Sequence, residues 1–297
     1  MTETHFDDST PLATELADLS KRRAALTSAQ APKPLKTRIF TVANQKGGVG
    51  KTTTAVNIAA ALARFKSRVL VIDLDPQGNA STALGIDHHT DIPSIYDAVV
   101  GVTPLADVVQ VSPENPLLLC APSNLDLAGA EIELVSMAAR EYRLQRALNA
   151  FLDSPAGANI DYVFIDCPPS LGLLTVNAFV AAQEVLIPIQ CEYYALEGVS
   201  QLVRNIDLVR EHLNPSLALS TILLTMFDTR TNLAHQVVAD VKTHFPQQTL
   251  AAVIPRSVRV SEAPSYGQTV IEYDQSSPGA VSYQEAALEL AHRGAAQ

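Results

Sequence analysis

A glycine-rich segment, NQKGGVGKTTT at residues 44–54, constrains the fold of this chain more than any other segment. It follows an apolar run, RIFTVAN (38–44), and leads into a pattern that predicts a helix from about Lys51 to Phe65. Glycines between a strand and a helix let the backbone curl so that its N–H groups point at an anion. The N-terminal end of the helix adds its dipole. The segment therefore predicts a strand–loop–helix unit that binds phosphate.

The segment departs from the usual phosphate-loop pattern, G-x-x-x-x-G-K-[ST]. Gly50, Lys51 and Thr52 fit the end of that pattern, but Gln45 stands where the first glycine is expected. Lys51 is expected to neutralise the β- and γ-phosphates of a nucleotide, and the Thr52 hydroxyl is placed to bind Mg²⁺. An extra lysine, Lys46, follows Gln45, and the general pattern gives it no role.

Short apolar runs alternate with helical stretches along the rest of the chain. The predicted strands after the first are RVLVIDLD (68–75), LLLCAP (117–122), YVFIDC (162–167), EVLIPI (184–189), STILLTMF (220–227) and LAAVIP (250–255). Residues 131–152 are predicted to form one long amphipathic helix. This alternation predicts the α/β class: a doubly wound, mostly parallel sheet with helices on both faces. Ligands should bind at the carboxyl ends of the strands.

Acidic side chains follow two of the predicted strands. Asp73 and Asp75 end the strand in VIDLDPQGNAST, and Asp166 ends the strand in YVFIDCPPS. A carboxylate at the end of a buried strand, downstream of a phosphate loop, is typical of a Walker B acid that completes the Mg²⁺ shell, often through water. Asp73 and Asp75 suit similar roles around the metal, although an ordinary solvated strand end would also explain them.

The N-terminal segment differs in composition from the rest. Residues 1–36 are polar and contain three prolines, and AQAPKPLK is typical of an extended linker. We expect a flexible N-terminal tail over 1–36 and a single P-loop ATPase domain over 37–297. A second interpretation of the tail is a partner-docking helix, because Leu12, Leu16 and Leu19 would share one helical face.

Composition limits the partners. The chain carries 21 basic and 31 acidic residues, for a net charge of −10, so any DNA binding must use a local basic patch. Three scattered cysteines without a C-x-x-C pair disfavour zinc and iron–sulfur sites and fit a reducing cytoplasm. The acidic N-terminus lacks a signal-peptide pattern, and no apolar run is long enough to cross a membrane.

Five segments, taken in order, resemble the ParA/Soj family of chromosome- and plasmid-partitioning ATPases. They are KGGVGKTTT, LDPQGNAST, IDCPPSLG, LLTMFDTRTNL and IPRSVRVSEAPSYG, and the match runs from about residue 37 to about 290. That family belongs to the deviant-Walker group, with MinD and the nitrogenase iron protein. The N-terminal tail lies outside the match.

The resemblance implies roles for individual residues. Lys46 would be the signature lysine, which reaches the partner's phosphates across an ATP-bound sandwich homodimer, and Asp75 would orient or activate the attacking water. Lys46, Lys51 and Asp75 are therefore the expected catalytic residues, and Thr52 and Asp166 the expected Mg²⁺ ligands. The expected ATP contacts are Lys46, Gly47, Gly48, Val49, Gly50, Lys51, Thr52, Thr53, Pro255 and Ser257. At position 257 the family commonly has asparagine, so Ser257 is a departure.

The resemblance also implies partners: non-specific double-stranded DNA and a ParB-type protein that stimulates slow ATP hydrolysis. Arg230, Arg256 and Arg259 stand where family members grip DNA phosphates, although neighbouring acids such as Asp228 and Glu262 could neutralise them instead. We expect a cytoplasmic, nucleoid-associated protein. Two alternatives remain: a related ParA/MinD-like ATPase that positions another cargo or the division site as a nucleotide-gated scaffold, and a membrane-bound positioning ATPase. The acidic, alanine-rich C-terminus disfavours the second.

Overall fold

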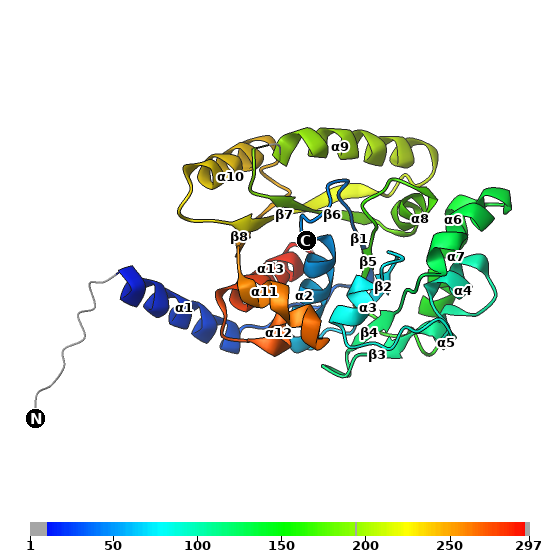
Figure 1. Ribbon diagram of the computed structural model, residues 1–297, viewed down its shortest axis with the longest axis horizontal. Coiled ribbons are helices and arrows are strands. Elements are labelled where there is room, and N and C mark those ends of the chain that lie inside the picture. Colours follow the sequence, from blue (N-terminus) through cyan, green and yellow to red (C-terminus); the bar gives the residue numbers. More distant parts are fainter. Residues whose placement is uncertain (1–10, 194, 295–297) are drawn as a thin grey trace, which may run out of the picture.

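The computed structural model describes residues 11–193 and 195–294 (Figure 1). Eight strands form one sheet in the spatial order β3-β4-β2-β5-β1-β6-β7-β8. All neighbouring strands are parallel except the β3–β4 pair, which is antiparallel. The strands are β1 (Arg38–Val42), β2 (Val69–Asp73), β3 (Gln110–Val111), β4 (Leu118–Ala121), β5 (Tyr162–Asp166), β6 (Glu184–Gln190), β7 (Ala218–Phe227) and β8 (Thr249–Pro255). The predicted doubly wound, mostly parallel sheet is confirmed.

Helices cover the sheet on both faces. The longer ones, of eight residues or more, are α1 (Pro11–Ser28), α2 (Lys51–Arg64), α6 (Leu127–Ser136), α7 (Arg143–Leu152), α8 (Leu173–Ala181), α9 (Ala195–His212), α10 (Asn232–His244) and α13 (Pro278–Arg293). The shorter ones are α3 (Asn79–Ala83), α4 (Ile95–Val100), α5 (Leu105–Val108), α11 (Val258–Glu262) and α12 (Val270–Tyr273), with 3-10 turns η1 (Arg140–Tyr142) and η2 (Ala263–Tyr266).

The core consists of two apolar layers separated by the sheet. Side chains alternate across a strand, so Ile39 and Ile165 face the layer under α4 to α10, whereas Phe40 and Phe164 face α2 and α13. Figure 1 shows α9 and α10 on one side of the sheet and α2 and α13 on the other. Phe40 and Phe164 stack with ring centroids 5.2 Å apart. Burial on both faces explains why these strands are apolar at nearly every position.

The register of the central strands fixes the place where ligands can bind. β1 lies between β5 and β6, and β5 lies between β1 and β2. Asp166 is level with Val42 of β1 on one side and with Asp73 of β2 on the other. Both carboxylates therefore lie at the carboxyl edge of the sheet, directly beside the loop that connects β1 to α2.

The helix predicted over 131–152 is interrupted, so that prediction was wrong. The chain leaves α6 at Met137, which is extended, and Ala139 takes a left-handed conformation with φ of 50°. Asn177 of α8 stabilises the break: its Nδ2 donates to the Arg140 carbonyl at 2.9 Å, and its Oδ1 accepts from the Leu144 N–H at 3.2 Å. These partners come from a distant part of the chain, and they replace the helical hydrogen bonds that are missing at the break.

The segment predicted as a flexible tail contains helix α1, which contacts α13. The Arg22 guanidinium donates to both carboxylate oxygens of Glu285, at 2.8 and 2.6 Å, and Leu26 is buried with 8% of its surface exposed. Leu16, on the predicted docking face, is 58% exposed. Residues 1–10 and the side chain of Leu12 lie outside the described part of the structure. The ion pair with α13 and the burial of Leu26 distinguish α1 from a fully solvated tail.

We predict that Leu26→Ala releases α1 without unfolding the domain beneath it. The substitution should weaken the docking of α1 by about 2 kcal/mol, because a buried leucine becomes a smaller side chain. Hydrogen exchange should show faster exchange of the α1 amides and unchanged protection of β1 and α2. Leu16→Ala is the matched control and should leave α1 protected. Faster exchange throughout β1 and α2 would show instead that α1 is integral to the domain.

Candidate nucleotide-binding site

The loop after β1 has the backbone of a phosphate cradle. Gly48 and Gly50 have φ of 73° and 88°, which side-chain-bearing residues rarely adopt, and Gly50 is the N-cap of α2. A Cβ atom added at Gly47 or Gly48 would meet no atom within 4 Å, so the space in front of the loop is open. Backbone N–H groups and the start of a long helix therefore border an open cavity.

Two distant strands hold this loop in place. Asn44 donates from Nδ2 to the Pro188 carbonyl of β6 at 2.8 Å, and its Oδ1 accepts from the Lys46 N–H at 3.0 Å. Thr225 of β7 donates to the Val49 carbonyl at 2.9 Å. Both polar side chains are buried, so these hydrogen bonds are shielded from water. Sequence reasoning missed Asn44 and Thr225, since their role depends on which strands lie side by side.

The two lysines of the loop point to different partners. Lys51 is buried, and its Nζ donates to the Lys46 carbonyl at 3.3 Å, which closes the loop on itself. Burial lowers the pKa of Lys51, and nearby Asp166 opposes that shift. The Lys46 ammonium instead lies 3.0 Å from the Glu192 carboxylate, beyond the end of β6, and both side chains are about half exposed. Lys51 therefore forms its hydrogen bond within the loop, whereas Lys46 pairs with a residue outside the loop.

The two level carboxylates of β2 and β5 are fully buried. Asp73 accepts from the N–H and hydroxyl of Ser81 at 2.8 and 2.7 Å, and burial still raises its pKa to about 6. Neither carboxylate oxygen of Asp166 has a hydrogen-bond partner among the described residues. Burial, and then the neighbouring Asp73, raise the pKa of Asp166 well above its ordinary value, and the nearby Thr52 hydroxyl and Lys51 oppose this shift only in part. A buried carboxylate without a partner is costly unless a cation or an ordered water satisfies it.

A cavity of about 650 Å³ lies in front of the loop. Its lining residues are Gly47, Gly48, Gly50, Lys51, Thr52, Thr53, Asp75, Pro76, Gln77, Asn79, Ala128, Pro169 and Met226. The structure thus brings together the glycines, Lys51, Thr52 and Asp75, which sequence reasoning placed in one site. Asp75 accepts from the Gln77 N–H at 3.0 Å, and this turn fixes the direction of its carboxylate. Volumes of this order suit a small organic ligand.

Two of the expected ATP contacts, Pro255 and Ser257, do not line this cavity. Pro255 ends β8 beside Phe227 of β7, whose neighbour Met226 is a lining residue. Ser257 is the N-cap of α11 and makes no capping bond with its side chain. Met226, with φ of 52°, was not predicted as a site residue. The available signal was its place at the end of a predicted strand, where ligands bind in such sheets.

The three candidate DNA-binding arginines are each next to carboxylates. Arg230 pairs with Asp228 through two hydrogen bonds, at 2.8 and 2.7 Å, and this pairing lowers the pKa of Asp228. Arg256 lies 4.0 Å from Glu192, the partner of Lys46. Arg259 lies 3.2 Å from the Glu262 carboxylate and 3.6 Å from the Asp274 carboxylate. All three are exposed, and β7 and β8 bring Arg230 and Arg256 to adjacent strand ends.

Comparison with known proteins places this arrangement in a family. Residues 37–219 match a family model described as an AAA domain. The chromosome partitioning protein ParA of Myxococcus xanthus is 51% identical over 256 residues, which cover 86% of this chain and 88% of that protein. The sporulation initiation inhibitor protein Soj of Bacillus subtilis is 50% identical over 257 residues, which cover 86% and 99% of the two chains.

Solved structures have the same fold. A Mycobacterium smegmatis protein described as cobyrinic acid a,c-diamide synthase, with a bound ATP analogue and magnesium, is 41% identical. It superposes with a TM-score of 0.73 over 85% of this chain and 93% of its own. The cell division ATPase MinD of Pyrococcus furiosus, at 24% identity, has a TM-score of 0.69 over 85% and 98% of the two chains.

Among the described residues, no helix has both the length and the apolar character needed to cross a bilayer. The loop carries two lysines, and two carboxylates lie level with each other beside it. Relatives that cover most of this chain are about half identical to it. The chain belongs to the ParA/Soj family of chromosome-partitioning P-loop ATPases.

Proposed function

We propose that this chain is a DNA-segregation ATPase whose ATP-bound sandwich dimer binds double-stranded DNA without sequence preference. A ParB-type partner would stimulate its slow hydrolysis of ATP and so release the dimer from DNA. The single observation that carries the proposal is that the half-exposed Lys46 ammonium pairs with Glu192 and not with its own loop. The ParA relatives are named chromosome partitioning proteins, and this name supports the cellular role.

The cavity has the chemistry required for ATP with Mg²⁺. The loop N–H groups and Lys51 would hold the phosphates, and the Thr52 hydroxyl would hold the metal. Asp166, buried and without a hydrogen-bond partner among the described residues, would complete the metal shell, directly or through water. The bound metal would neutralise charge that develops on the phosphate oxygens. A cation at this position also satisfies a carboxylate whose burial is otherwise uncompensated.

Lys46 would act in the other subunit. Its pair with Glu192 is about half exposed, and surface ion pairs of this kind contribute only about 0–1 kcal/mol. Glu192 therefore holds Lys46 weakly, and the phosphates of a second chain's nucleotide could take its place. In such a dimer each nucleotide would be bound by two subunits, so that ATP stabilises the interface and its loss weakens it.

Asp75 would position the attacking water. It lines the same cavity as Lys51 and Thr52, and its carboxylate is oriented by the Gln77 N–H. Phosphoryl transfer depends mainly on positioning and on neutralisation of charge. An acceptor oxygen in front of the phosphate loop can align water for in-line attack, and it would act slowly until the second subunit completes the site.

We predict that Lys46→Ala abolishes the ATP-dependent dimer and, with it, ATP-dependent DNA binding. Light scattering and duplex binding should be measured with ATP, with ADP and without nucleotide; the variant with ATP should match the wild-type protein with ADP. Lys242→Ala, which removes an exposed lysine of α10, is the matched control. A normal ATP-dependent dimer of Lys46→Ala would exclude the cross-subunit role. A wild-type dimer that binds no duplex would favour a scaffold for another cargo.

We predict that Asp75→Ala traps the ATP-bound dimer. Turnover should fall at least about 100-fold, because the water loses its acceptor, while ATP binding persists. When both are measured on the same samples, the rate of phosphate release should fall and the lifetime of the dimer should increase. Asp107→Ala is the control, since it removes an exposed carboxylate of α5 that does not line the cavity. Wild-type turnover by the Asp75 variant would remove this residue from the mechanism.

We predict that Asp166→Asn stabilises the nucleotide-free protein and removes its response to Mg²⁺. The folded-state pKa of Asp166 is raised, so its carboxyl group lowers stability as the pH rises above the ordinary value of 3.8 toward the folded-state pKa. A neutral amide avoids the cost of burying a charge, so the free energy of unfolding at pH 7 should rise. Thermal unfolding with ATP, with and without Mg²⁺, provides the test. A metal-dependent rise in Tm equal to that of the wild-type protein would contradict the assignment.

A further inference from the structure

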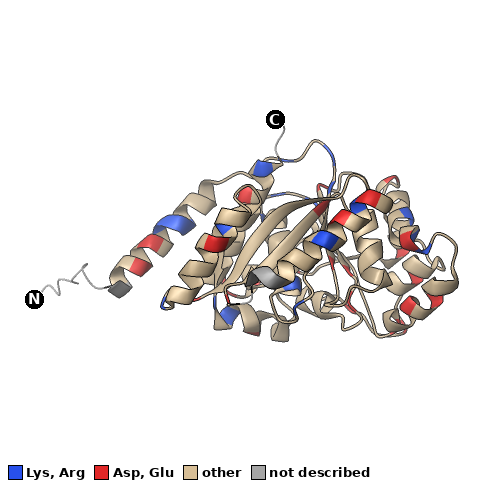
Figure 2. Ribbon diagram, turned by 90° about the horizontal axis from the view of Figure 1, so that it is seen from above, with Lys and Arg blue, Asp and Glu red and all other residues tan. Residues whose placement is uncertain are grey.

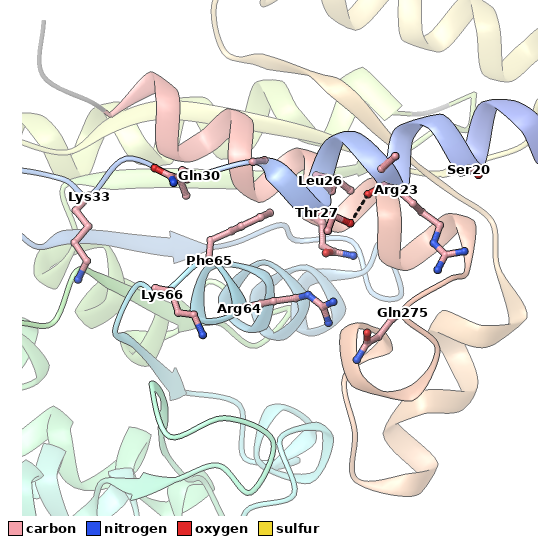
Figure 3. Close-up of a pocket in the computed structure, with 14 residues that line it drawn as sticks. Ser20, Arg23, Leu26, Thr27, Gln30, Lys33, Arg64, Phe65, Lys66 and Gln275 are labelled. Carbon is pink, nitrogen blue, oxygen red and sulfur yellow. Dashed lines mark hydrogen bonds between the residues drawn. The ribbon is translucent and has the colours of Figure 1, made fainter.

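A second, larger groove lies between α1 and the C-terminal end of α2, with a volume of about 790 Å³. Figure 3 shows Arg23 entering it from α1, and Arg64 and Lys66 from the end of α2 and the residues that follow. Lys33, from the connection between α1 and β1, also lines it. The groove is separate from the nucleotide cavity, because α2 has 14 residues and its two ends are about 21 Å apart.

The lining of this groove is basic in a chain that is acidic overall. Its lining residues include four cations, Arg23, Lys33, Arg64 and Lys66, and no Asp or Glu. Lys33 pairs with Asp161 at 2.9 Å. Within residues 11–193 and 195–294, the other three have no ion pair or side-chain hydrogen bond. Figure 2 shows that the acidic residues of α1 lie nearer its N-terminus and that its basic residues come after them. Unpaired cations gathered around a concave surface favour a polyanionic ligand.

The arginines predicted from sequence to bind DNA are in the opposite situation, since each lies beside a carboxylate. Arg259 connects the two regions: it lies 3.6 Å from Asp274, and the next residue, Gln275, lines the groove. The loop between α12 and α13 therefore borders both the groove and Arg259 of the predicted DNA surface. A phosphate backbone following this path would pass from neutralised arginines to cations that have no competing partner.

We propose that the groove between α1 and α2 binds the phosphate backbone of double-stranded DNA and extends the DNA surface of each subunit. This inference rests on the proposed function, because it needs a dimer that binds DNA. It assigns a role to α1, which precedes the region matched by the family model. Arg and Lys contacts to phosphate carry no sequence information, so the groove would add affinity and salt dependence without specificity.

The test is a salt titration of binding to a short fluorescent duplex of mixed sequence, in the presence of ATP. Arg64→Gln and Arg23→Gln should each weaken binding and lower the slope of log K against log salt by about 0.9 for every phosphate that the variant no longer neutralises. Thr27→Lys, which adds a cation to the exposed wall of the same groove, should raise affinity and slope. Arg146→Gln removes an exposed arginine of α7, on the opposite face of the sheet, and should bind as the wild-type protein does.

The outcomes separate this inference from the proposed function. ATP-dependent dimerisation of each groove variant is measured first and should be unchanged, because the groove is remote from the nucleotide loop. Suppose that Arg64→Gln, Arg23→Gln and Thr27→Lys all bind DNA as the wild-type protein does, with unchanged salt slopes. This result would exclude DNA binding by the groove and leave the proposed function intact. An ATP-bound wild-type dimer that binds no duplex would overturn both. Equally weakened binding in Arg146→Gln and Arg64→Gln would show a general charge effect and would also overturn the groove.

Discussion

The parallel hydrogen bonding of β1, β5 and β2 is the constraint on which the rest of the structure depends. It brings the last residue of β1 level with Asp166, and Asp166 level with Asp73, so the phosphate loop begins directly beside two carboxylates. A shift of one residue in β5 would turn Asp166 toward the opposite apolar layer. Packing on both faces of the sheet fixes the register, since Phe40 and Phe164 stack in one layer while Ile39 and Ile165 fill the other.

Much of this arrangement can be predicted from the sequence, because buried parallel strands are short apolar runs and the loop after the first has a distinctive spacing. Lys51, Thr52 and Asp75 meet in one cavity as expected. The break at residues 137–139 could not be predicted, because it depends on Asn177, a residue from another helix. Local periodicity continues through the break, but the alternative hydrogen bonds that stabilise it are non-local.

Polar partners were predictable only where they are close in the sequence. Asp228 was named as a possible partner of Arg230, and the two pair through two hydrogen bonds. Glu192 was not foreseen as the partner of Lys46, because the sheet brings the two together across 146 positions. Helix α1 is similar: the three leucines predicted a docking face, but Arg22 forms the ion pair with Glu285 of α13, and Leu26 is the buried leucine. The spacing of apolar residues does not reveal which face of a helix packs against another element.

The balance of charge around the loop explains why the proposed site would need help from outside the chain. Asp73 and Asp166 are buried beneath the loop, and Asp75 borders the cavity. Of the two loop lysines, only Lys51 donates a hydrogen bond to the loop itself. A triphosphate added to this site would face the Asp75 carboxylate and the Lys51 ammonium group, with the acidic side chains of Asp73 and Asp166 buried beneath them. A divalent cation held by Thr52 and Asp166 would remove part of that repulsion, and in the proposed dimer a lysine from the second chain would remove more. Nucleotide binding, metal binding and dimerisation would then depend on one another, since each supplies charge that the others require.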